Sequence, residues 1–144
     1  MKRLVVLGVV AVLVLMPAVI ASGANPSLRS AVRYVRAKCG STAEPNTSMW
    51  MNGFAFNAIY GNCKAGDGTD QHIWFFVGGR FVGVDSRMPS KSIIGLWRDD
   101  KTLAFMYVLY RSSDPNCCPT GGGKVVRFRW NGKRVVALDR IPHP

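Results

Sequence analysis

The feature that most constrains the fold is a series of three hairpin-like patterns in the second half of the chain. In each pattern, two apolar segments of strand length flank a short turn sequence. The paired segments are residues 73–77 and 80–84, residues 93–98 and 102–111, and residues 125–130 and 133–138. The third turn contains Asn131-Gly132, the strongest short hairpin signal. These patterns predict a mainly β (α+β) fold, an antiparallel meander of about six strands.

The turn sequences also predict which residues face one another. A two-residue turn at Gly78-Gly79 sets the register of the first hairpin. The expected opposite pairs are Val77 with Arg80, Phe75 with Val82, Ile73 with Val84 and Trp74 with Gly83. The second hairpin is apolar on both faces, which is typical of strands in the centre of a sheet that is covered on each side.

The third hairpin separates apolar from basic side chains. One face is expected to be apolar, and its members are Val126, Phe128, Trp130, Val135 and Ala137. The other face is expected to hold Arg127, Arg129 and Arg134, with Arg129 directly across from Arg134. Like charges in that position cost stability. Either both guanidinium groups reach into water, or an anionic group lies between them.

A single helix is expected from Asn25-Pro26 to Gly40, and it is a candidate cover for the second hairpin. Asn favours the N-cap, Pro the first helical position, and Gly the conformation that ends a helix. The residues expected on the apolar face are Leu28, Val32, Val35 and Cys39. A second stripe is basic, with Arg29, Arg33 and Arg36. We interpret it as solvated, in preference to a membrane-binding face.

The segment between this helix and the first hairpin is rich in turn signals. Pro45, Asn46 and the glycines around Asp67 predict turns within residues 40–70. Residues 49–60 are mostly apolar. We expect this part to form irregular or short-strand structure that lies on the core.

The first 24 residues have the pattern of a cleavable signal peptide. Lys2 and Arg3 precede an apolar run over residues 4–16, and small residues permit cleavage after Ala21 or Ala24. The run is short for a membrane span, so an uncleaved anchor is the less favoured alternative. The expected organisation is a signal peptide over residues 1–24 and one globular domain over residues 25–144. The expected location is secreted or in the extracytoplasmic cell envelope.

The net charge of the chain points to the class of partner. It is +11, and a surplus of this size attracts anions. Candidate partners are an anionic envelope polymer, a lipid headgroup or a protein. Nucleic acid is not expected as a partner, because the chain is predicted to be exported. The alternative is that the surplus serves only solubility.

Four cysteines, Cys39, Cys63, Cys117 and Cys118, allow three disulfide pairings. Outside the cytoplasm an even set is normally oxidised. A bond between the adjacent Cys117 and Cys118 demands a strained ring. We therefore favour separate bonds from these two cysteines to Cys39 and Cys63.

Reactive sites find little support in the sequence. The two-residue spacing of redox cysteines and zinc ligands is absent. A nucleophilic cysteine served by His72 has no spatial support, and we interpret His72 as a half-exposed strand residue. The sequence therefore predicts no catalytic residues, no metal site and no cofactor.

Part of the chain resembles a known family. Residues 72–81 (HIWFFVGGRF), residues 110–119 (YRSSDPNCCP) and residues 126–130 (VRFRW) are similar to the LppP/LprE family of actinobacterial envelope lipoproteins. The resemblance covers about residues 72–142. The matching motif residues are Asp114, Pro115, Cys117, Cys118 and Pro119.

The resemblance implies a small cell-envelope protein and no enzymatic activity. Members carry a lipidated cysteine after the signal peptide, whereas the first cysteine of this chain is Cys39. The protein is therefore expected to be secreted free or held by an uncleaved signal. The favoured function is a non-enzymatic binding or structural module with a basic face. The alternative is a thiol/disulfide redox activity, or another cysteine-based activity, at Cys117 and Cys118.

Overall fold

The computed structural model describes residues 28–40, 43–63 and 70–142. They form one helix, α1 (Leu28–Cys39), and two four-stranded antiparallel sheets. The first sheet contains β1 (Glu44–Asn46), β2 (Phe56–Asn62), β3 (Gln71–Val77) and β4 (Arg80–Val84). The second contains β5 (Ile93–Arg98), β6 (Thr102–Val108), β7 (Gly123–Trp130) and β8 (Val135–Ala137). In both sheets the strands follow one another in chain order.

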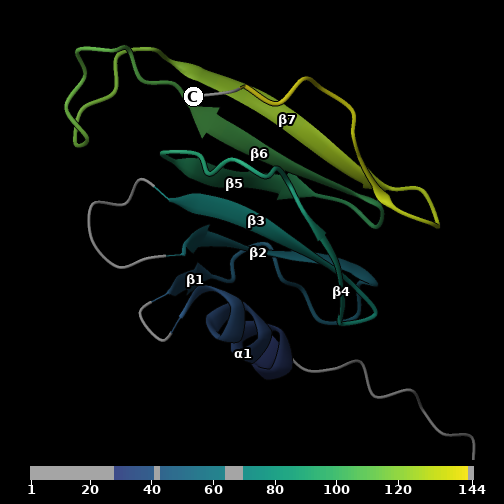
Figure 1. Cartoon of the computed structure of the whole chain (residues 1–144). Helices are drawn as coiled ribbons and strands as arrows, with labels where there is room; N and C mark the ends of the chain where they lie inside the picture. The colour runs from purple at the N-terminus through teal and green to yellow at the C-terminus, as the bar shows by residue number, and fades with distance from the viewer. Residues whose placement is uncertain (1–27, 41–42, 64–69, 143–144) are drawn as a thin grey trace, which may run out of the picture.

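The elements stack in three layers, with the helix below the first sheet and the second sheet above it (Figure 1). The main core lies between the sheets, where Phe75 meets Phe128 with ring centroids 4.9 Å apart. Tyr60 meets Phe105 there at 5.5 Å. The mainly β class is confirmed, but the single meander of about six strands is wrong. The chain leaves the first sheet after β4 and begins a second, so the apolar faces bury each other.

The helix covers the outer face of the first sheet. Ala31 and Val35 are buried against Ile59, Trp74 and Phe76. The predicted apolar face of the helix is thus confirmed. Its predicted position over the second hairpin is wrong, because β2 and β3 present the apolar face that it buries. Gly40, with φ of 101°, ends the helix in the left-handed region as expected.

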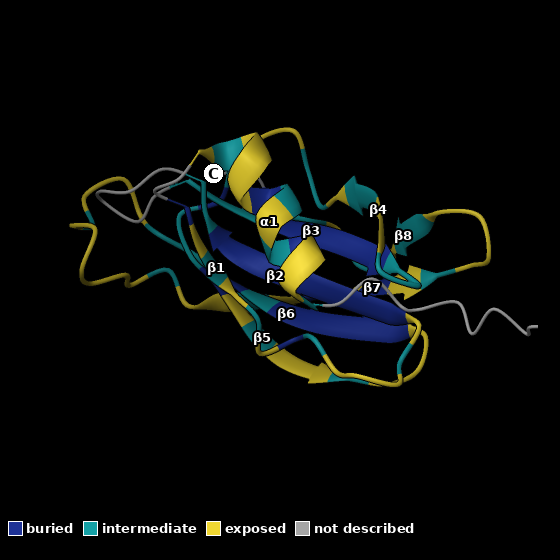
Figure 2. Cartoon of the chain, turned by 90° about the horizontal axis from the view of Figure 1, so that it is seen from below, coloured by how far each residue is buried: buried dark blue, intermediate teal, exposed yellow. Residues whose placement is uncertain are grey.

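β2 differs most from the prediction, because part of the segment expected to be irregular or to form short strands is a buried strand of seven residues. Its residues from Phe56 to Gly61 are all buried, because the helix lies on one face and the second sheet on the other. Figure 2 shows β2, β3 and β6 as the buried centre and the outward helix surface as exposed. A strand covered on both sides lacks the polar alternation that would have identified it.

The first hairpin contains a bulge that shifts its register. Val77 lies opposite Arg80, as predicted. Val82 lies at an irregularity beside Phe75 and Phe76, so the other predicted pairs are wrong. The observed pairs are Phe76 with Phe81, Phe75 with Gly83 and Trp74 with Val84. One extra residue in β4 places the ring of Phe75, not that of Trp74, opposite the glycine.

The second hairpin forms, but only one of its strands is central. β5 is an edge strand that leaves Ile94, Leu96 and Trp97 exposed, whereas β6 lies between β5 and β7. The prediction that both strands are covered on each side is therefore wrong for β5. An apolar pattern does not distinguish an edge strand from a central one.

The end of β5 is tied to the first sheet by Arg98. Its guanidinium donates hydrogen bonds to the carbonyl oxygens of Met49 and Phe56 and to Oδ1 of Asn57, at 2.6–3.1 Å. The same group lies 4.4 Å from the ring centroid of Phe54. Arg98 is thus engaged inside the protein and does not contribute an open surface charge.

The disulfides differ from the favoured pairing. Cys39, at the end of α1, is bonded to Cys63, just after β2, with Cα atoms 4.6 Å apart. Cys117 and Cys118 are bonded to each other. The favoured separate pairing is wrong, because Cys39 and Cys63 belong to the helix and the first sheet. The other two lie in a loop between strands of the second sheet. The bond from Cys39 fastens the end of the helix to the segment that follows β2.

Candidate functional site

The three predicted anion-binding arginines lie at different places around β7 and its turn. Arg127 and Arg129 are exposed on β7, and Arg134 is exposed in the turn before β8. Arg129 lies opposite Val136, not opposite Arg134, so that part of the prediction is wrong. The turn contains four residues, because Trp130 pairs with Val135.

The longer turn is closed by the side chain of Asn131. Its Oδ1 accepts hydrogen bonds from the backbone N of Lys133 at 3.0 Å and of Arg134 at 2.9 Å. An asparagine side chain that bonds the backbone two or three residues later stabilises a turn locally. The result places the exposed cations Lys133 and Arg134 together beyond the end of the sheet.

Arg127 is neutralised within the protein. Its Nε donates to Oδ2 of Asp139 at 2.9 Å, and its Nη2 donates to Oδ1 at 3.0 Å. Its backbone N also donates to Oδ2 at 3.0 Å. Hydrogen bonds from Arg127 lower the pKa of Asp139 to about 2, and the bond to Asp139 raises the pKa of Arg127. The structure therefore leaves Arg129 and Arg134 as the open members of the predicted set.

Arg129 borders a shallow hollow shared with the turn between β5 and β6. Asp99, Asp100 and Lys101 line the same hollow. Asp99 accepts hydrogen bonds from the backbone N of Lys101 at 2.8 Å and of Thr102 at 2.6 Å. The bond from Lys101 is the main reason that the pKa of Asp99 lies below its usual value. Asp99 is thus an ionised neighbour that offsets part of the charge of Arg129.

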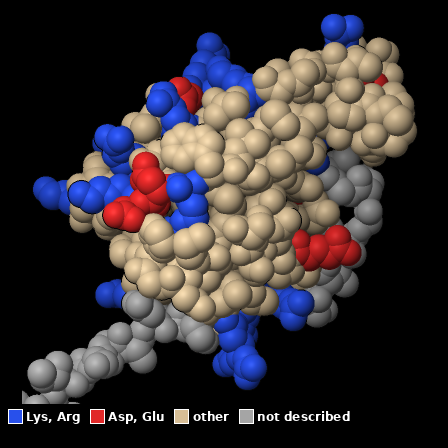
Figure 3. All heavy atoms as spheres, turned by 180° about the vertical axis from the view of Figure 1, so that it is seen from behind, with Lys and Arg blue, Asp and Glu red and all other residues tan. Residues whose placement is uncertain are grey.

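Four of the eight acidic residues are engaged in local hydrogen bonds, whereas most of the described cations have no acidic partner. Asp85, Asp99, Asp114 and Asp139 accept short backbone or side-chain hydrogen bonds. Across the described residues, Arg127 alone among the lysines and arginines has an acidic partner within 4.0 Å. Figure 3 shows basic groups gathered at one end and along the lower edge of one face, with acidic groups interspersed among the basic groups at that end.

The loop between β6 and β7 is organised by Asp114. The side-chain oxygens of Asp114 accept hydrogen bonds from the backbone N of Arg111, and from the backbone N and Oγ1 of Thr120, each at 2.7 Å. The bond from the Thr120 backbone is the largest cause that lowers the pKa of Asp114. Cys117 and Cys118 lie exposed within the segment that these bonds close. Figure 1 shows this loop extending past the end of the second sheet.

The lowered pKa of Asp114 predicts an acid-dependent loosening of this loop. The ionised form accepts the three bonds, so they are complete above the ordinary pKa of about 3.9. They are lost as the pH falls through the lower pKa of the folded state. We expect the protection of the Thr120 and Arg111 amides against hydrogen exchange, relative to the intrinsic rate at each pH, to be lost below that point, measured by NMR. In Asp114→Asn this pH dependence should be absent; an unchanged acid transition there would contradict the role given to Asp114.

A buried polar cluster between the sheets was missed in the sequence. The side chain of Asp85 is fully buried, and its Oδ1 accepts a hydrogen bond from the backbone N of Ile73 at 3.0 Å. Its Oδ2 accepts one from the hydroxyl of Tyr107 at 2.7 Å. Burial is the main cause that raises the pKa of Tyr107. Asp85 directly follows β4, and nothing in the local sequence shows that it turns inward.

His72 lies beside this cluster. Its Nδ1 is 3.6 Å from Oδ1 of Asp85, and its Nε2 is 4.0 Å from Oδ1 of Asp70. The side chain is 16% exposed, so the expected half-exposed strand residue is more buried than predicted. The acidic neighbours of His72 are thus Asp85 and Asp70, and the two exposed cysteines of the loop are bonded to each other. Within those same residues, no group of three or more metal-ligating side chains occurs.

Comparison with known proteins gives the family. A family model described as LppP/LprE lipoprotein matches residues 55–133, which is more than half of the chain. The protein belongs to the LppP/LprE lipoprotein family. The resemblance drawn from the motifs is thereby confirmed. The family region contains Asp114, both loop cysteines, Arg127 and Arg129, whereas Arg134 lies one residue beyond it.

Related proteins of this family occur in mycobacteria. Proteins named as lipoprotein LppP from Mycobacterium bovis and Mycobacterium tuberculosis are 34% identical to the chain over 79 residues. The match spans 55% of this chain and 45% of theirs, so the chain spans about half the length of these relatives. No solved structure matches the chain.

Membership of the LppP/LprE family is consistent with a protein of the cell envelope. The predicted signal peptide, residues 1–24, lies outside the described residues. Among the helices of the described part, none is long and apolar enough to cross a membrane.

Proposed function

We propose that the protein is a non-enzymatic binding module of the cell envelope that holds an anionic partner on its basic surface. The supporting observation is which charged side chains already have partners within the protein and which do not. Asp139 and Asp99 are engaged in local bonds, Arg129 and Arg134 lie exposed at the β7–β8 end, and the exposed Lys133 adjoins Arg134 in the same turn. An open cluster of cations raises the local concentration of anions and binds clustered negative groups. Lipid headgroups and acidic envelope polymers present such groups.

Vesicle co-sedimentation tests this proposal. The probe is phosphatidylglycerol vesicles, with phosphatidylcholine vesicles as the uncharged comparison. The test variant Arg129→Gln/Arg134→Gln removes two open cations without removing a buried contact. We expect the apparent dissociation constant for phosphatidylglycerol to rise about thirtyfold, since each of the two cations near an anionic surface contributes about 1 kcal/mol.

The matched control is Arg29→Gln/Arg33→Gln, which removes the same charge from the helix in the opposite layer. It should weaken binding much less. Equal weakening in both variants would show that only net charge matters. It would contradict the assignment of the anion-binding site to the β7–β8 end. A charge-neutral change, Arg127→Gln/Asp139→Asn, should leave binding unchanged because that pair is already neutral.

A second candidate function is a thiol/disulfide activity at Cys117 and Cys118. Its support is that the two residues are exposed and bonded to each other within the loop that Asp114 organises. This candidate requires a labile bond. If Cys117→Ser/Cys118→Ser keeps full vesicle binding, the two activities are separate, and the cysteine loop is not needed for the proposed one.

A further inference from the structure

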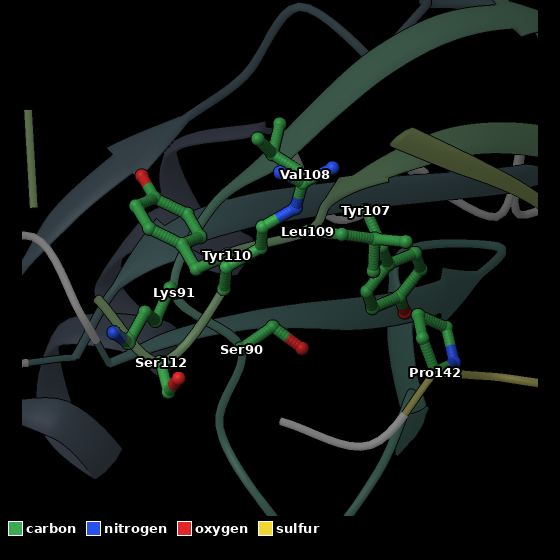
Figure 4. Close-up of a pocket in the computed structure, with 9 residues that line it drawn as sticks. Ser90, Lys91, Tyr107, Val108, Leu109, Tyr110, Ser112 and Pro142 are labelled. Atoms are coloured by element: carbon green, nitrogen blue, oxygen red, sulfur yellow. The ribbon is translucent and has the colours of Figure 1, made fainter. Parts of the chain in front are cut away.

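A cavity of about 340 Å³ opens at the other end of the second sheet from Arg129 and Arg134. It lies where the chain enters β5 and leaves β6, with Pro142 closing one side (Figure 4). The lining residues are Ser90, Lys91, Tyr107, Val108, Leu109, Tyr110, Arg111, Ser112 and Pro142. The volume lies at the small end of the range for ligand sites.

One side of the cavity is apolar and held in place. Tyr107 is 1% exposed, and its hydroxyl is fixed by the hydrogen bond to the buried Asp85. Pro142 lies beside Tyr107, and Leu109 lies between Tyr107 and Tyr110 in Figure 4. A wall whose side chains are already ordered costs little additional entropy when a ligand binds.

The other side of the cavity is cationic. The Nζ of Lys91 lies 4.9 Å from the ring centroid of Tyr110, on the same side of the cavity in Figure 4. In the described chain, Lys91 has no carboxylate within 4.0 Å. The second cation, Arg111, has Asp114 as its acidic neighbour, but the oxygens of Asp114 already accept three hydrogen bonds. Among the described residues, Arg111 and Lys91 therefore both lack an acidic partner within 4.0 Å, and Lys91 is the cation whose Nζ lies over the Tyr110 ring at the cavity.

We propose that this cavity binds a small amphiphile with one carboxylate head group. The carboxylate pairs with Lys91, and the apolar tail lies on the partly exposed Leu109 and Pro142. Charge complementarity selects the head group, because an uncharged or cationic head leaves Lys91 without a partner. The site shares no residue with the basic cluster at the β7–β8 end, so it stands independently of the proposed vesicle binding.

Chemical-shift mapping of the unmodified protein with decanoate, below its micelle-forming concentration, tests this site. We expect saturable shifts confined to the amides of residues 90–91 and 107–112. Decyltrimethylammonium has the same tail length and an inverted charge, and it should not shift these amides. Shifts that do not saturate, shifts spread over the surface, or equal binding of both amphiphiles would overturn the proposal.

Two variants separate this site from the vesicle-binding surface. Lys91→Met keeps the length of the side chain at a partly exposed position and should raise the dissociation constant for decanoate about tenfold. Arg129→Gln/Arg134→Gln should leave decanoate affinity unchanged. If decanoate affinity instead falls only in the arginine variant, the cavity is not the site, whatever the outcome with vesicles.

Discussion

Removing the disulfide between Cys39 and Cys63 with a double serine substitution should lower the free energy of unfolding by about 3–4 kcal/mol. The two residues are 24 positions apart, and a cross-link over that length restricts the unfolded chain by about this amount. The bond also fastens the end of α1 to the first sheet, so its loss should loosen the helical layer first. Urea unfolding followed by circular dichroism measures the change.

The other disulfide is the matched control for this prediction. Cys117 and Cys118 are adjacent, so their bond closes almost no chain, and both are exposed. The double serine substitution there should leave the free energy of unfolding nearly unchanged. If the two double variants were equally destabilised, chain restriction would not be the reason for the stability of the helical layer.

Replacing Asp85 with alanine should lower the free energy of unfolding by about 2–4 kcal/mol. The substitution leaves the backbone N of Ile73 and the hydroxyl of Tyr107 buried without an acceptor. Each buried donor left unpaired costs about 1–3 kcal/mol. Thermal and urea unfolding of the variant give the change in stability.

Tyr107→Phe and Asp139→Ala serve as comparisons. Tyr107→Phe removes one of the two donors along with its need for an acceptor, so its cost should be about 1 kcal/mol. Asp139 also accepts several hydrogen bonds, but at the surface, where water replaces them. Its substitution should change stability far less than that of Asp85. A loss as large at Asp139 as at Asp85 would contradict the importance given to burial.

The parts of the fold that the sequence predicts well are those set by local chemistry. Gly78-Gly79 does place Val77 opposite Arg80, and Gly40 does end the helix. The predictions that the structure contradicts concern features set by contacts between residues far apart in the sequence. β2 is buried on both faces between the helix and the second sheet, so its sequence shows no regular alternation of polar and apolar residues. The position of β5 at an edge depends likewise on where the second sheet begins.

The candidate site shows the same division. The exposed basic side of β7 follows from alternation along the strand, and Arg127 and Arg129 lie there as predicted. The neutralisation of Arg127 depends on Asp139, which lies beyond β8 and whose approach is set by how the strand ends. The prediction that Arg129 lies opposite Arg134 is wrong, because Asn131 closes a turn of four residues where the Asn-Gly sequence predicts a turn of two. Asp85 reaches Tyr107 only because the two sheets stack, and the cavity forms where the segments before β5 and after β6 meet Pro142.

Whether the protein acts by holding an anionic partner is tested most directly by a salt titration of vesicle binding. Charges at a surface interact over about 10 Å at 0.1 M salt and about 3 Å at 1 M. The wild-type protein should therefore bind phosphatidylglycerol vesicles at 0.1 M salt and lose most of that binding at 1 M salt. It should not bind phosphatidylcholine vesicles at either salt concentration. Binding that is equal for the two lipids, or that is unchanged by salt, would contradict an electrostatic binding function.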